Sequence, residues 1–206
     1  MIHINNVMSR FISINWSFLC LMAGILLFSA QSNAQISVAN PSFEDEAADA
    51  TTPQGWHPCD NMTTPDIFPG FWGVYNEPSD GNTYVGIITR ENGTFEQFGQ
   101  RLSSKLKKEQ CYRTSIDLAH SIIYSGYNKP IQVRIYIGSS KCDKNQLIFE
   151  SPVVKSMKWS THIIEFVPDA EHEYFIIQAH YSDEPFNHKG NILLDNMKPL
   201  VICGNT

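Results

Sequence analysis

Short apolar runs separated by turn residues limit what this chain of 206 residues can fold into. Runs such as 83–89, 131–137 and 162–167 are rich in Val, Ile, Thr and aromatic residues, and Gly, Pro, Asn or Asp lie close to their ends. This pattern is typical of short β-strands joined by turns. Hardly any stretch of the chain spaces its apolar residues as a helix would. The sequence therefore predicts an all-β sandwich of about eight to ten strands.

The clearest alternation of apolar and polar residues lies in the middle of the chain. In 131–137 four aliphatic side chains point one way and Gln132, Arg134 and Tyr136 the other, because side chains in a strand have a period of two. Residues 111–120 alternate in a similar way. We expect the two runs to pair as an antiparallel hairpin across the loop that contains Tyr124 and Tyr127.

The first 34 residues have the pattern of a secretory signal peptide. They contain Arg10 and no acidic residue, then an apolar run at 18–28, and end in Ser-Asn-Ala. The apolar run is shorter than the ~20 residues that a membrane-spanning helix needs. We therefore predict a signal peptide at 1–34 and one exported domain at 35–206, without a membrane span after cleavage. Its predicted location is secreted, periplasmic or on the cell surface.

The charge of the chain excludes some partners. The formal net charge is −6, and no run of basic residues is present. An acidic surface repels phosphate groups, so we expect neither nucleic acid nor an anionic membrane to be the partner.

Four cysteines follow the predicted signal peptide: Cys59, Cys111, Cys142 and Cys203. An even number in an exported chain predicts two disulfides. None belongs to a C-x-x-C pair, which disfavours a metal–thiolate site. If 111–120 and 131–137 form a hairpin, Cys111 and Cys142 flank its open end within the ~4.4–6.8 Å that a disulfide spans between Cα atoms. We therefore predict Cys111–Cys142 and, for the remaining two, Cys59–Cys203.

Several phrases of the sequence recur together in one type of module. They are 40–44 (NPSFE), 55–56 (GW), 80–84 (DGNTY), 99–102 (GQRL), 130–135 (PIQVRI) and 190–195 (GNILLD). The chain resembles the galactose-binding-like jelly roll of many carbohydrate-binding modules. It is similar in particular to a module of exported proteins of Gram-negative gliding bacteria, often fused to an OmpA-like or surface-sorting domain. The resemblance covers nearly all of 35–206. It implies a sandwich whose first and last strands meet, with Phe43 and Glu44 in a short first strand.

The resemblance also implies a structural Ca²⁺ between the two ends of the chain. Glu44 and Asp195 fall at the matching positions, with Ser42 and Asn40 as further ligands. Calcium takes 6–8 oxygen ligands, so backbone carbonyls would complete the set. The residues also allow an alternative in which Glu44 caps a turn and Asp195 accepts hydrogen bonds from backbone N–H groups.

Exposed aromatic and planar polar side chains are the candidates for ligand binding. Sugars are bound by aromatic rings that cover their C–H patches and by polar groups that fix their hydroxyls. The candidates are Trp72, Tyr75, Tyr124, Tyr127, Arg134, Tyr136 and His180. They favour a non-catalytic module that binds a glycan or a cell-envelope surface.

Two other functions stay open. The chain contains neither a G-x-S-x-G nor an H-E-x-x-H motif. Arg134, Gln178, His180 and Tyr181 are residue types that a jelly-roll polysaccharide lyase uses, although the motifs of known lyases are not reproduced. A subunit for protein–protein adhesion or surface assembly would use the same exposed aromatic residues as a glycan-binding module.

Overall fold

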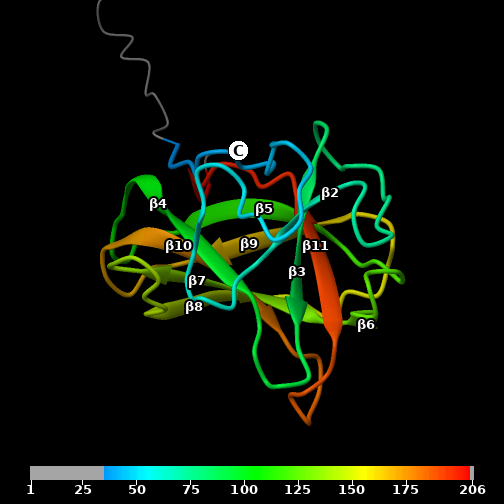
Figure 1. Ribbon diagram of the computed structural model, residues 1–206. Coiled ribbons are helices and arrows are strands. Elements are labelled where there is room, and N and C mark those ends of the chain that lie inside the picture. The colour runs from blue at the N-terminus through cyan, green and yellow to red at the C-terminus, as the bar shows by residue number, and fades with distance from the viewer. Residues whose placement is uncertain (1–34, 205–206) are drawn as a thin grey trace, which may run out of the picture. The chain divides into compact units, whose positions relative to one another are not determined.

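The computed structural model describes residues 35–204, so the predicted signal peptide lies outside the described residues. Two β-sheets form the domain (Figure 1). The first sheet has the order β1 (His57–Pro58), β4 (Gln97–Leu106), β10 (His172–His180), β7 (Gln132–Gly138) and β8 (Gln146–Glu150). The predicted all-β class is confirmed. The described residues include no helix that is long and apolar enough to cross a membrane.

The second sheet has the order β12 (Val201–Ile202), β5 (Tyr112–Ala119), β11 (Gly190–Asp195), β3 (Tyr84–Thr89) and β2 (Asp66–Phe68). Two more strands join it: β9 (Ser160–Phe166) pairs with β5, and β6 (Lys129–Pro130) pairs with β11. All registered strand pairs in both sheets are antiparallel except β6–β11, which is parallel.

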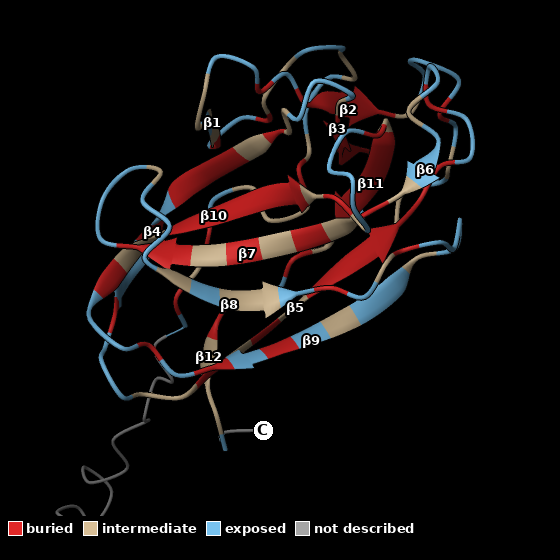
Figure 2. Cartoon of the chain, turned by 90° about the horizontal axis from the view of Figure 1, so that it is seen from below, coloured by how far each residue is buried: buried red, intermediate tan, exposed pale blue. Residues whose placement is uncertain are grey.

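The main core lies between the sheets. Strand β7 buries Val133, Ile135 and Ile137 and leaves Arg134 and Tyr136 partly exposed, as the alternation predicted (Figure 2). Strands β3 and β11 are buried along their whole length instead. A strand reads as continuously apolar when both of its faces are covered.

A second, smaller core covers the outer side of β3 and explains why that strand is buried on both faces. It contains Phe68, Tyr84, Ile88 and Tyr124 among its buried members, with Trp159 packed against it from outside. Gly86 lies beneath this core, and a Cβ atom there would come within 2.6 Å of the Phe68 ring. The second core anchors the loops that follow β2 and β5, and these loops carry four of the seven predicted ligand-binding residues.

The predicted central hairpin is wrong. Both of its strands exist, but β5 pairs with β9, β11 and β12, whereas β7 pairs with β10 and β8 in the other sheet. The segment between them runs along β11 as β6 before it enters β7. Alternation shows which face of a strand is buried, but it does not show which sheet the strand joins.

The predicted disulfide pairing is wrong for the same reason. The bridges are Cys59–Cys142 and Cys111–Cys203, each with a Cα–Cα distance of 5.4 Å. Cys111 and Cys142 do not pair, because β5 and β7 belong to different sheets. Cys203 follows β12, which lies beside β5, and its N–H donates to the Cys111 carbonyl at 3.1 Å.

The two ends of the domain meet as predicted. The N–H of Ile36 donates to the Leu200 carbonyl at 3.0 Å, and Leu200 returns the bond at 2.7 Å. The expected strand at Phe43 and Glu44 is absent from this described part of the chain. Phe43 lies in a turn with a φ of 53°, and its N–H donates to the Asn40 carbonyl.

Candidate functional site

The structure divides the seven predicted ligand-binding residues among three places. These are a pocket between loops (Trp72, Tyr124, Tyr127), an adjoining cleft (Tyr75), and the outer face of the first sheet (Arg134, Tyr136, His180). The pocket, here called the Trp72 pocket, has a volume of about 370 Å³. That volume lies within the range typical of small-molecule sites.

Two aromatic side chains line the Trp72 pocket near its opening. Trp72 is 47% exposed and has a φ of 52°, and its carbonyl accepts the Ser125 N–H at 3.2 Å. This bond ties the loop after β2 to the loop after β5. Tyr127 is half-buried, and Asn191 fixes its backbone through a 2.6 Å hydrogen bond to its carbonyl. The backbone of both residues is thus anchored through its carbonyl group.

A buried acid lies deeper in the pocket. Asp66 in β2 accepts hydrogen bonds from the Tyr124 hydroxyl and, at 2.7 Å, from the Ala50 N–H. Burial raises the pKa of Asp66, and hydrogen bonding with Tyr124, Ala50 and the Trp72 side chain opposes that rise. Tyr124 itself is buried, and its pKa is raised by burial and by the neighbouring Asp66. Tyr124 therefore positions the carboxylate and is not the exposed ring that the sequence suggested.

Arg90 lines the same pocket at the end of β3. Its Nη2 donates to Glu96 at 2.6 Å and to the Thr64 hydroxyl at 3.2 Å. Its Nη1 is buried and has no hydrogen-bond partner among the described residues. A buried donor without a partner costs free energy, which a ligand acceptor or a bound water would recover.

Glu96 holds Arg90 in place from below. Its carboxylate is fully buried and also accepts hydrogen bonds from the Thr64 N–H and hydroxyl and from the Ile88 N–H. Burial raises the pKa of Glu96 to about 7 in spite of the adjacent guanidinium. The acceptors that fix Nη2 are therefore built into the fold, and they leave Nη1 without a partner among the described residues.

The outer face of the first sheet brings together Arg134, Tyr136 and His180. Its polar groups satisfy one another, however. Arg134 pairs with Glu150 at 2.5 Å. The Lys144 ammonium donates to the side-chain carbonyls of Gln97 and Gln178 at 2.9 and 2.7 Å and lies over the Tyr136 ring.

The four residues considered for a lyase do not all share this face. Gln178 lies opposite Arg134 across β10 and β7, with His180 two residues along β10. Tyr181 is buried, and its hydroxyl donates to the backbone carbonyls of Arg90 and Thr94. The Tyr181 hydroxyl therefore stabilises the turn after β3 and does not point to the outer face of the first sheet.

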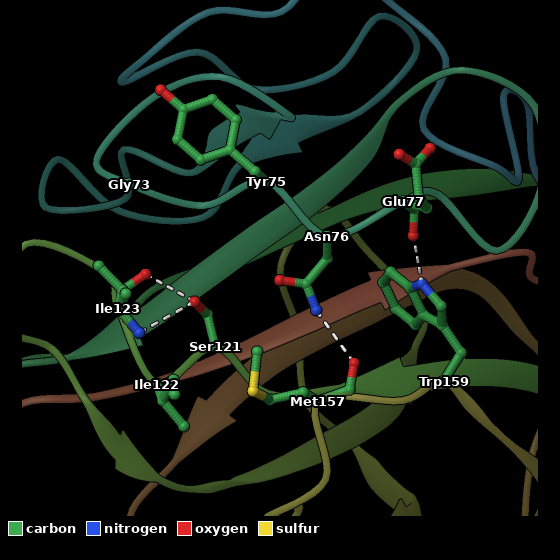
Figure 3. A pocket seen from close by; sticks show the side chains of 9 residues that line it. All are labelled: Gly73, Tyr75, Asn76, Glu77, Ser121, Ile122, Ile123, Met157 and Trp159. Atoms are coloured by element: carbon green, nitrogen blue, oxygen red, sulfur yellow. Dashed lines mark hydrogen bonds between the residues drawn. The ribbon is translucent and has the colours of Figure 1, made fainter.

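Tyr75 lies in a cleft of about 410 Å³, here called the Tyr75 cleft (Figure 3). The loop after β2 supplies Tyr75, Asn76 and Glu77, and the segment before β9 supplies Met157 and Trp159. The indole N–H of Trp159 donates to the Glu77 carbonyl at 2.7 Å, and Asn76 donates to the Met157 carbonyl at 3.0 Å.

The two acidic residues predicted to bind calcium, Glu44 and Asp195, accept hydrogen bonds from the backbone of one loop, residues 79–83. The Glu44 carboxylate accepts the N–H groups of Asn82 and Thr83, at 3.0 and 3.2 Å at the shortest. Asp195 accepts those of Ser79 and Asp80 at 2.7 and 2.9 Å. These contacts match the alternative in which the two acids serve as acceptors for backbone donors. The donor set does not fit calcium well, and calcium stays a prediction.

The other two predicted ligands are engaged in the same region. The Ser42 hydroxyl donates to Asp80, and the Asn40 side-chain oxygen accepts the Glu44 N–H. Among residues 35–204, one group of three potential metal ligands lies close together. It consists of His57, Cys59 and Cys142. Both of those cysteines are in a disulfide.

Sequence reasoning missed the charged residues that line the Trp72 pocket, Asp49, Asp66 and Arg90, and it also missed Glu96, which binds Arg90. One signal was present. Arg90 and Glu96 flank an Asn92-Gly93 dipeptide, which is typical of a tight turn, and the bridge between Thr89 and Phe95 brings them together. Opposite charges on both sides of a tight turn indicate an ion pair. No comparable signal placed Asp66 beneath Trp72.

Comparisons with known proteins identify the fold. No protein-family model matches the sequence, and no curated protein sequence is significantly similar to it. Among solved structures, a Stig cyclase, Fisc, from Fischerella sp. TAU matches with a TM-score of 0.55 and 14% identity, over 82% of this chain and 96% of that one. The arabinose-bound α-L-arabinofuranosidase MgGH51 matches with a TM-score of 0.52 and 13% identity, over 82% of this chain but only 26% of that one.

Carbohydrate-binding modules also occur among the similar structures. A family 16 carbohydrate-binding module matches with a TM-score of 0.48 and 15% identity, over 80% of this chain and 98% of that one. At identities this low a likeness concerns the fold and not the ligand. The chain has the jelly-roll β-sandwich fold that the cyclase and a domain of the arabinofuranosidase share.

Proposed function

We propose that the Trp72 pocket binds a sugar unit of a glycan and that the protein is a non-catalytic glycan-binding module. One observation carries the proposal. The buried Nη1 of Arg90 has no hydrogen-bond partner among residues 35–204, and Arg90 lines a pocket that also presents the Asp66 carboxylate and two aromatic rings. Donor, acceptor and apolar surface in one small pocket are the combination that a sugar requires.

Each side chain has a separate role in the proposed complex. The rings of Trp72 and Tyr127 cover a C–H patch of the sugar. Asp66 accepts a hydrogen bond from one hydroxyl, and Arg90 donates to a neighbouring oxygen. Hydrogen bonds to charged groups contribute about 1.5–3 kcal/mol each. Because Tyr124, Glu96 and backbone contacts hold these groups in place before binding, little conformational entropy is lost.

Export to the periplasm or the cell surface belongs to the same proposal, with a surface glycan or another envelope component as the partner. Two disulfides support it, because such bonds persist in oxidising compartments. The N-terminal residue of the protein recovered from a cell envelope or medium fraction tests it. Cleavage before Gln35 is expected.

Binding is tested by calorimetric titration of the 35–206 protein with cello-, xylo- and laminari-oligosaccharides, after a glycan array has selected the series. Trp72→Ala is expected to weaken binding by about tenfold or more, since an aromatic contact contributes ~0.5–1.5 kcal/mol beyond its buried area. Tyr136→Ala, on the outer face of the first sheet, is the matched control and is expected to bind as the wild type does.

Two results would contradict the proposal. Loss of binding in Tyr136→Ala with binding kept in Trp72→Ala would move the site to the first sheet. No binding to any glycan, together with specific capture of a protein from the cell envelope, would favour an adhesion or assembly subunit.

A further inference from the structure

The Tyr75 cleft and the Trp72 pocket are neighbours. The boundary between them, here called the wall, is formed by two pairs of consecutive residues, one pair from each loop. Gly73 and Ile123 line the cleft, and their chain neighbours Trp72 and Tyr124 line the pocket. A Cβ atom on Gly73 would lie 2.7 Å from the Ile123 side chain, so the two loops touch here. The hydrogen bond from Ser125 to Trp72 closes the same wall. The pocket and the cleft are therefore separated only by this contact between the two loops.

The cleft is organised before any ligand arrives. The indole of Trp159 is fixed by its bond to the Glu77 carbonyl and by the Tyr84 ring, whose centroid lies 5.3 Å away in an edge-on contact. Asn76 ties the loop after β2 to the segment before β9 (Figure 3). Rigid side chains lose little freedom on binding, which favours affinity.

The exposed chemistry of the cleft also suits a sugar. Tyr75 is 71% exposed. No other large hydrophobic residue in 35–204 has a higher exposed fraction. Within residues 35–204 neither the Tyr75 hydroxyl nor the Glu77 carboxylate has a hydrogen-bond partner or an ion-pair partner. Ile122 and Ile123 add exposed apolar surface on the opposite side. The cleft therefore offers an exposed aromatic ring and, two residues along the same loop, a carboxylate.

We propose that the Tyr75 cleft binds the next unit of the same glycan chain. This inference rests on the proposed function of the Trp72 pocket and narrows the ligand to a linear oligosaccharide with at least two consecutive units in contact. The bound chain crosses the wall formed by Gly73 and Ile123, with one unit against Trp72 and the next against Tyr75. A module built for one terminal sugar would need only the pocket.

The test is the dependence of affinity on chain length. Cello-, xylo- and laminari-oligosaccharides of one to six units are titrated into the wild type, Tyr75→Ala and Trp72→Ala. In the wild type the affinity is expected to rise at least tenfold from one unit to three. Tyr75→Ala is expected to remove most of that rise and to leave the single-unit affinity unchanged. Trp72→Ala is expected to weaken binding at every length.

Ile163→Ala is the control, because Ile163 is an exposed aliphatic residue of β9 outside both sites. It should bind every length as the wild type does. Binding that depends on Trp72 but does not strengthen with length, or that is the same in Tyr75→Ala, overturns the extended site and leaves the proposed function standing. If no oligosaccharide binds to the wild type, the proposed function fails and the extended site fails with it.

Discussion

Two arginine–glutamate pairs in this molecule have almost the same geometry and very different surroundings. Arg90 meets Glu96 at 2.6 Å, and Arg134 meets Glu150 at 2.5 Å. The side chains of the first pair are 15% and 0% exposed, and those of the second 31% and 39%. The first pair lies beneath the Trp72 pocket, and the second lies on the outer face of the first sheet.

The comparison shows why a short ion pair does not by itself mark a site. Arg134 and its partner Glu150 are both within reach of water, so their pair is an exchangeable surface contact. Arg90 is held by Glu96 and Thr64 through one nitrogen, while the other has no partner among the described residues. Burial makes this spare donor costly, and only a bound oxygen atom relieves the cost.

The largest expected difference between the two pairs is in stability. Glu96→Ala leaves the Arg90 guanidinium buried without its main partner and is expected to lower the free energy of unfolding by about 3–5 kcal/mol. Glu150→Ala breaks a surface pair and is expected to cost less than about 1 kcal/mol. Urea denaturation of the two variants measures both. Equal losses would show that burial does not distinguish the pairs.

The dependence of stability on pH separates the pairs next. Burial raises the pKa of Glu96 from 4.5 to about 7, so the folded state holds the proton more tightly than the unfolded state does. Protonated Glu96 makes its full contribution to the free energy of unfolding below pH ~4.5. That contribution, up to about 3 kcal/mol, is lost as the pH rises through ~7.

Urea denaturation at pH values from 4 to 8 tests this dependence. In Glu96→Gln the free energy of unfolding is expected to fall less between pH ~4.5 and ~7 than in the wild type. In Glu150→Gln it is expected to fall as in the wild type. The difference between wild type and variant is the quantity to compare, because burial also raises the pKa of Asp195 to about 6. A Glu96→Gln curve parallel to that of the wild type would contradict the buried acid.

A third test compares the hydroxyl groups of Tyr124 and Tyr136, which were both predicted from the sequence to bind a ligand. Tyr124→Phe removes the donor that binds Asp66 and is expected to cost about 1–3 kcal/mol, because the carboxylate stays buried with one partner fewer. Tyr136→Phe removes a partly exposed hydroxyl and is expected to be neutral. Thermal unfolding compares the two variants, and a neutral Tyr124→Phe would show that Asp66 does not need its hydroxyl partner.

The smallest expected effect concerns calcium. Because Glu44 and Asp195 already accept hydrogen bonds from backbone N–H groups of residues 79–83, EDTA is expected to leave the melting temperature of the 35–206 protein unchanged. A bound ion would stabilise the folded state by mass action. A fall in melting temperature on adding EDTA, reversed by Ca²⁺, would instead support the predicted calcium site.

Much of the fold was readable in the sequence, because period-two alternation and turn residues are local signals. They placed most of the strands and the inward faces of β5 and β7. The resemblance to known jelly rolls placed the meeting of the first and last segments. Alternation also marked Arg134 and Tyr136 correctly as outward-facing.

What the sequence determined by itself is therefore the class of fold and the face that each strand buries. The tertiary structure alone decided the pairing of β5 and β7, the two disulfides, and the gathering of Asp66, Arg90 and Trp72 around one pocket. These depend on contacts between segments that are distant along the chain. A local pattern reports the environment of one strand, but it does not report which strand lies beside it, so the site could be recognised only after the sheets were assembled.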